Sequence, residues 1–117
     1  MKRVLIIDDA PFIRMTLRKL LENNGYTVVG EAENGKEGII KFEQHRPDIV
    51  TLDITMPEMG GVDTLKKVMD IDRTAKVIMV SALGQESIIR ESIIYGAKSF
   101  IVKPFKDDQV LKTLSKF

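Results

Sequence analysis

The sequence predicts a three-layer α/β domain, in which one five-stranded parallel sheet carries helices on both faces. Two observations predict it. Five short apolar runs alternate with stretches whose apolar residues recur at helical spacing, all within 117 residues. The run at residues 49–52 is bulky, largely β-branched and free of charge, which is typical of a central strand buried on both faces. A doubly wound sheet of order 2-1-3-4-5 is the expected arrangement.

The first half of the chain gives two strands and two helices. A strand is expected at 4–7, and the helix after it places Ile13, Leu17, Leu20 and Leu21 on one face. Residues 27–32 are more polar, so we place that strand at an edge of the sheet. Asn34-Gly35 leads into a second helix, and Gly38 within it is expected to pack closely on the sheet.

The second half repeats the alternation three times. The expected elements are the central strand with Asp53 at its carboxyl end, a helix beyond Gly61, a strand at 77–80 ending at Ser81, a helix at 86–95, a strand at 100–102 running into Lys103-Pro104, and a last helix from Asp107.

Length and composition fit a single domain over residues 1–117 with no output domain. A chain of this length, 44% hydrophobic and 30% charged, buries roughly two thirds of its unfolded surface. The net charge of +1, with acids and bases interspersed, does not predict nucleic-acid binding, and we expect a monomer. The absence of cysteine excludes disulfides and thiolate metal sites and fits the cytoplasm. The apolar run at 4–7 is too short for a signal peptide or a membrane span.

Polar side chains end four of the five strands. They are Asp8 and Asp9, Asp53, Ser81 and Lys103. Because the carboxyl ends of parallel strands meet at one edge of the sheet, we expect these side chains to form one pocket. Two carboxylates about 4 Å apart repel by on the order of 4 kcal/mol at an effective dielectric of 20, so a cation must compensate.

Oxygen ligands without histidine or cysteine favour Mg²⁺ as that cation. We expect Asp9 to bind the metal directly, Asp8 directly or through water, and the backbone carbonyl of Thr55 to join them beside Asp53. Mg²⁺ usually retains waters and binds phosphate oxygens as well, so the site is predicted to carry out phosphoryl chemistry.

Asp53 is the predicted nucleophile, since an aspartate can attack phosphorus when cations neutralise the developing charge. Lys103 is expected to pair with Asp53 at rest and with a phosphoryl oxygen afterwards. The Ser81 hydroxyl would donate to another phosphoryl oxygen.

Simpler interpretations exist for several of these residues. Asp8 and Asp9 precede a helix and are equally suited to cap it. Arg14, Arg18 and Lys19 are interpreted as a solvated basic face of the first helix.

Two other classes of protein compete. A metal-dependent phosphohydrolase with an Asp53 nucleophile needs a second acid two residues further on, where Thr55 stands. A flavin carrier of the same sheet order needs a Ser/Thr/Gly-rich phosphate loop after the first strand, where the chain has acids and a proline.

Four motifs together resemble the receiver domain of two-component response regulators. They are D-D at 8–9, D-x-T-M-P-E-M-x-G at 53–61, S-A at 81–82 and K-P-F at 103–105. The stretches D-D-A-x-F-x-R, S-A-x-G-Q and G-A-K-x-F-I-V-K-P-F are most similar to the single-domain chemotaxis regulators of that family. The 2-1-3-4-5 order is already known for those regulators, so it is no independent deduction from this chain.

The resemblance implies a phosphorylation switch. Asp53 would accept phosphate from a sensor histidine kinase, and the Lys103-Pro104 bond would be cis. Phosphorylation would draw Ser81 inward and let Phe100 rotate into the vacated space. Many relatives have tyrosine where Phe100 stands, so a readout that needs that hydroxyl is not expected here.

The fourth helix supplies the expected output surface. Its large apolar residues are spread too widely for one buried stripe, so some must face outward. The resemblance implies that the flagellar motor switch protein binds there, with Ile94 and Tyr95 in the contact, and that a phosphatase completes the cycle. A role as a phosphorelay intermediate, or as the receiver of a larger DNA-binding regulator, is the alternative.

Overall fold

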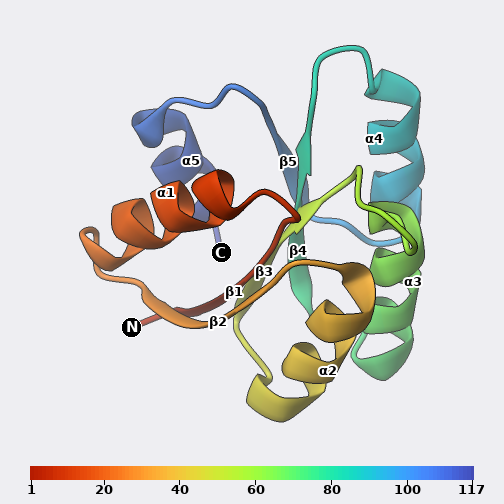
Figure 1. The fold of residues 1–117 in the computed structure, drawn as a ribbon, viewed down its shortest axis with the longest axis horizontal. Coiled ribbons are helices and arrows are strands. Elements are labelled where there is room, and N and C mark those ends of the chain that lie inside the picture. Colours follow the sequence, from red (N-terminus) through yellow and green to blue (C-terminus); the bar gives the residue numbers. More distant parts are fainter.

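Five parallel strands form one sheet in the computed structural model, which describes residues 1–117 (Figure 1). The strands are β1 (Arg3–Ile7), β2 (Thr27–Ala32), β3 (Ile49–Asp53), β4 (Lys76–Ser81) and β5 (Ser99–Val102). Their order is β2-β1-β3-β4-β5, which confirms the predicted sheet and the placement of β2 at an edge.

Helices cover both faces of the sheet and complete the three layers. They are α1 (Pro11–Glu22), α2 (Gly35–His45), α3 (Gly61–Ile71), α4 (Glu86–Ile94) and α5 (Asp107–Leu114). Figure 1 shows α1 and α5 on one face and α2, α3 and α4 on the other. None of the helices is both long and apolar enough to cross a membrane.

Strand alternation divides the core between the two faces. On β1, Val4 and Ile6 join the cluster beneath α1 and α5, whereas Leu5 and Ile7 join the cluster beneath α2 and α3. All five residues of β3 are buried, as expected of a strand with helices on both sides. The sheet is therefore packed against helices on both faces.

Gly38 confirms the predicted close packing of α2. A Cβ atom on Gly38 would lie 2.6 Å from Cδ1 of Ile7, which is closer than real carbon atoms approach. The helix therefore rests directly on β1, next to the strand end that carries Asp8.

The register brings the strand ends together. Ile7 of β1 pairs with Leu52 of β3, and Asp53 pairs with Val80 of β4. Ser81, the next residue on β4, pairs with Val102 of β5. The residues that follow these pairs therefore emerge side by side at one edge of the sheet.

Candidate functional site

Three carboxylates converge at this edge of the sheet. Each of Asp8, Asp9 and Asp53 offers an oxygen atom, and these atoms all lie within 4.8 Å of one another. Asp8 and Asp53 are buried, with 1% and 5% of their surfaces exposed, while Asp9 is exposed. The arrangement is an acidic pocket with one open side, and its oxygen donors suit a hard divalent cation.

The two aspartates at residues 8–9 do not cap the helix that follows them. The N-cap of α1 is Ala10, and no side chain bonds to the first turn there. Asp8 Oδ1 instead accepts the Ala10 N–H at 2.9 Å, which turns the chain into the helix. The capping interpretation is therefore wrong.

Lys103 brings one positive charge to the two buried carboxylates. Its Nζ lies 3.0 Å from Asp8 Oδ2 and 3.6 Å from Asp53 Oδ1. The ammonium is thus nearer to Asp8 than to the expected partner, Asp53. The Lys103-Pro104 peptide bond is cis, as predicted.

Asp53 has an unusual electrostatic environment. Burial and then the charge of Asp8 raise its pKa from 3.8 to about 7, against the opposing effects of Lys103 and of the Thr55 N–H, which donates to Asp53 Oδ1 at 3.3 Å. A single lysine does not offset the desolvation and repulsion at this carboxyl. The pocket therefore favours an additional cation, either a proton or a metal.

Ser81 ends β4 with a buried hydroxyl that has no hydrogen-bond partner. Its backbone carbonyl accepts the Lys103 N–H at 2.6 Å, so the two residues lie together at the pocket. Leaving a buried hydroxyl unpaired destabilises a fold by about 1–3 kcal/mol, so this hydroxyl is suited to donate to a bound ligand. The hydroxyl of Thr51 is also buried and unpaired, and nothing in the structure explains it.

Gln85 is a site residue that the sequence reasoning did not assign. Its Nε2 donates to Thr55 Oγ1 at 2.8 Å, and its Oε1 accepts the Ala82 N–H at 2.6 Å. The side chain joins the loop after β3 to the loop after β4, and Thr55 in turn contacts Asp53. The S-A-x-G-Q motif is the only sequence signal that marks it.

The proposed switch residue and the proposed partner residues border different cavities. Phe100, which is 44% exposed, lines a cavity of about 360 Å³ with Ile89 and Arg90 of α4. Ile94 and Tyr95 line another one beside α3. The periodicity of α4 predicted outward apolar residues correctly, but not which neighbouring element each of them faces.

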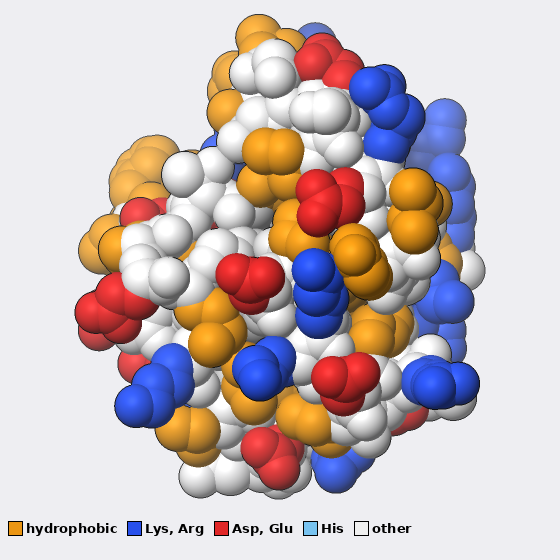
Figure 2. All heavy atoms as spheres, turned by 90° about the vertical axis from the view of Figure 1, so that its right-hand side faces the viewer, with side chains coloured by type: hydrophobic (Ala, Val, Ile, Leu, Met, Phe, Trp, Pro, Cys, Tyr) orange, Lys and Arg blue, Asp and Glu red, His pale blue; other side chains and the backbone are white.

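Tyr95 faces α3 through a cationic contact. The Nζ of Lys66 lies 4.2 Å from the centre of the Tyr95 ring. Figure 2, which views the molecule from the side of α3 and α4, shows apolar side chains distributed among charged ones rather than gathered in one continuous patch.

Comparisons with known proteins agree with this geometry. The model of the response regulator receiver domain matches residues 4–115. The chemotaxis protein CheY of Thermotoga maritima is 53% identical over 98% of this chain and 96% of its own length, and CheY of Bacillus subtilis is 52% identical over 97% and 95%. The crystal structure of the CheX-CheY-BeF3-Mg+2 complex from Borrelia burgdorferi contains a chain with a TM-score of 0.95 and 42% identity, covering 98% of this chain and 87% of that one.

The chain therefore belongs to the response regulator receiver domain family. It is closely related to the CheY chemotaxis proteins, which makes it a phosphorylatable response regulator of a two-component system that acts as a signalling switch.

Proposed function

We propose that a sensor histidine kinase phosphorylates this regulator on Asp53 with the help of Mg²⁺, and that phosphorylation changes its affinity for a partner protein. The observation that carries the proposal is the convergence of Asp8, Asp9 and Asp53, with the ammonium of Lys103 beside Asp8 and Asp53. The buried, unpaired hydroxyl of Ser81, whose carbonyl accepts the backbone N–H of Lys103, supports it further.

The donor set fits Mg²⁺, which is also named with BeF3 in the related Borrelia burgdorferi complex. Asp8, Asp9 and Asp53 would hold the ion together with the backbone carbonyl of Thr55. When bound, Mg²⁺ neutralises negative charge on the phosphoryl oxygens.

The side chains of the pocket perform the transfer. An oxygen of Asp53 forms a bond to phosphorus while the phosphorus–nitrogen bond of a phosphohistidine breaks and the electron pair leaves with the imidazole. The Lys103 ammonium would then pair with one phosphoryl oxygen, and the Ser81 hydroxyl would donate to another. The Lys103 ammonium at 3.6 Å from Asp53 Oδ1 and the unpaired hydroxyl of Ser81 support these roles.

Incubation with Mg²⁺ and a small acyl phosphate is expected to add one phosphate to the protein, measured as intact mass. Asp53→Asn should lose the modification, because an amide is not a nucleophile toward phosphorus. Asp70→Asn, on the exposed side of α3, is the matched control and should be labelled normally. Labelling of Asp53→Asn at the parent level, or labelling that proceeds equally in a chelator, would contradict the proposal.

We propose that the output partner binds the surface formed by α4, β5 and α5, and that this partner is a helical segment of the flagellar motor switch protein. Phe100 on β5 links this surface to Ser81, since Ser81 pairs with Val102 two residues further along β5. The side chain of Ile94 on α4, which is 81% exposed, supports the proposal as an apolar contact for such a helix.

Ile94→Glu and Tyr95→Glu are expected to weaken binding of a motor-switch peptide about tenfold or more without slowing phosphorylation, since each places a charge in an apolar contact. Titration of the phosphorylated protein with the peptide measures the effect. Ile40→Glu, at an exposed position of α2, is the control. If Arg90→Glu weakens binding and these two variants do not, the contact lies beside Phe100 rather than beside α3. Equal affinity of the phosphorylated and unphosphorylated forms would favour a phosphorelay role.

A further inference from the structure

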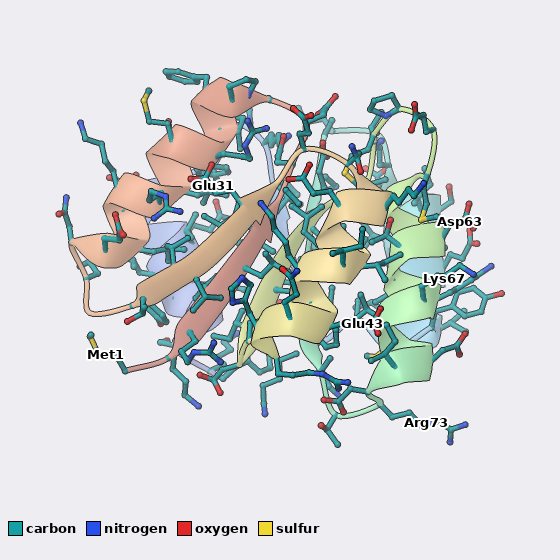
Figure 3. All side chains as sticks on the ribbon, turned by 60° about the horizontal axis from the view of Figure 1, so that its bottom comes forward. Met1, Glu31, Glu43, Asp63, Lys67 and Arg73 are labelled. Atoms are coloured by element: carbon teal, nitrogen blue, oxygen red, sulfur yellow. The ribbon has the colours of Figure 1, made fainter.

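Arg14 of α1 connects the acidic pocket to the edge of the sheet. Its Nη1 donates to the backbone carbonyl of Asp8 at 2.7 Å, and its Nε donates to Glu31 Oε1 at 3.2 Å. Only 16% of the Arg14 side chain is exposed. Figure 3 shows Glu31 on β2 where that strand passes α1. Arg14 is therefore not part of a solvated basic face, whereas Arg18 keeps 36% of its side chain exposed.

The carbonyl that Arg14 contacts belongs to the peptide group between Asp8 and Asp9. Because a peptide group is planar, fixing its oxygen also fixes the direction in which the Asp9 backbone leaves it. The Asp8 N–H donates to the Ala32 carbonyl at 3.0 Å, so Asp8 is held from both sides of its backbone. This anchored peptide group sets the position from which the exposed Asp9 side chain reaches the other two carboxylates.

Arg18 provides an internal comparison one helical turn further along α1. Its Nε lies 2.5 Å from Glu31 Oε2 and its Nη1 lies 3.2 Å from Glu22 Oε2. Arg18 thus shares Glu31 with Arg14 but has no bond to the loop after β1. Substituting Arg18 therefore affects only the tie between α1 and β2 through Glu31. Substituting Arg14 also removes the contact with the acidic pocket.

We propose that Arg14 is a positioning residue for the divalent-cation site: its guanidinium holds the Asp8–Asp9 peptide group so that both carboxylates face the same cation. This inference rests on the proposed Mg²⁺ site. The fork of a guanidinium is required, because one planar group donates in two directions, to a carbonyl and to a carboxylate. A lysine supplies the charge without that geometry.

The sign of the effect distinguishes positioning from simple electrostatics. Arg14 carries a positive charge near the cation site, so its removal should strengthen Mg²⁺ binding if charge alone mattered. Positioning predicts the opposite. Removing an outer partner of a metal ligand weakens metal affinity about 10–100-fold, and a backbone contact is expected to lie at the low end, near tenfold.

The test is calorimetric titration of the full chain with Mg²⁺ for the parent, Arg14→Met, Arg14→Lys and Arg18→Met. We expect about tenfold weaker binding in Arg14→Met, partial recovery in Arg14→Lys, and a change within twofold in Arg18→Met. Saturating Mg²⁺ should restore most of the rate at which Arg14→Met is labelled by an acyl phosphate. Thermal unfolding checks that each variant is folded at the titration temperature. If Arg14→Met is unfolded there, Arg14→Lys is compared with the parent instead.

Three results would overturn the inference. Unchanged or tighter Mg²⁺ binding in the Arg14 variants shows that the guanidinium does not orient the ligands. An equal loss in Arg18→Met shows that the effect comes from the α1–β2 tie. A parent protein that does not bind Mg²⁺ refutes the proposed metal site and this inference with it, whereas a parent that binds normally beside unaffected Arg14 variants refutes the inference alone.

Discussion

Asp53→Asn is expected to stabilise the metal-free fold at pH 8 by on the order of 2–4 kcal/mol, because it removes an ionised carboxylate from a buried and repulsive position. The elevation of the Asp53 pKa from 3.8 to about 7 corresponds to roughly 4 kcal/mol between the protonated and the ionised form. The asparagine amide oxygen still accepts the Thr55 N–H, so the local turn is retained.

The direction of the pH dependence follows from that pKa. Between about pH 4 and pH 7 the folded protein keeps the Asp53 proton that the unfolded chain has already released. Folding therefore takes up a proton in this window, and the free energy of unfolding falls as the pH rises through it. Asp53→Asn lacks this fall, so the difference between the two proteins should grow from pH 4 to pH 7 and then level off.

Urea unfolding at a series of pH values in a chelator measures the difference. Exposed Asp70→Asn serves as the control and should follow the parent. Curves for Asp53→Asn and the parent that remain parallel from pH 4 to pH 8 would show that the Asp53 carboxyl is not destabilised in the fold. Mg²⁺ should reduce the difference, because the ion compensates the same charges.

Gly61→Ala is expected to destabilise the protein by about 3 kcal/mol or more. A Cβ atom on Gly61 would collide with the carbonyl oxygen of Asp53 and lie 2.6 Å from the Cα of Ile54. Both obstacles are backbone atoms of the segment that carries the proposed nucleophile, so no side-chain rotation relieves them. The Gly61 N–H also donates to the Ile54 carbonyl at 2.8 Å, which keeps the start of α3 against the end of β3.

Gly60→Asn is the matched control for this substitution. Gly60 is the N-cap of α3 with φ −68°, and the nearest atom to its Cβ position is 3.9 Å away. Asparagine is a favoured N-cap residue, so this variant should be as stable as the parent or slightly more stable. Chemical unfolding compares the two variants. Equal stability of Gly61→Ala and the parent would show that α3 moves away from β3 at little cost.

The parallel topology explains why so much of the site was predictable. Once apolar runs are recognised as parallel strands, residues at their carboxyl ends must share one edge, whatever the details of the helices. Asp8, Asp53 and Lys103 satisfy this condition and lie together, and the backbone of Ser81 lies against that of Lys103. The prediction needed element types and order but no side-chain conformations.

Contacts that depend on side-chain reach were not predictable in this way. Arg14 and Arg18 meet Glu31 because α1 lies beside the edge strand β2, and helical periodicity marks both arginines only as polar. The nearer approach of Lys103 to Asp8 likewise depends on the path of a long flexible side chain. The orientation of Tyr95 toward Lys66 requires the relative placement of α3 and α4.

We propose that Asp53, among three neighbouring aspartates, accepts the phosphate. Reduction of the acyl-phosphate-labelled protein with borohydride converts a phosphorylated aspartate to homoserine, and peptide mass spectrometry then locates it. We predict homoserine at position 53 alone, in a yield that follows the amount of phosphate bound in Mg²⁺. Homoserine at position 8 or 9, with position 53 unchanged, would contradict the account.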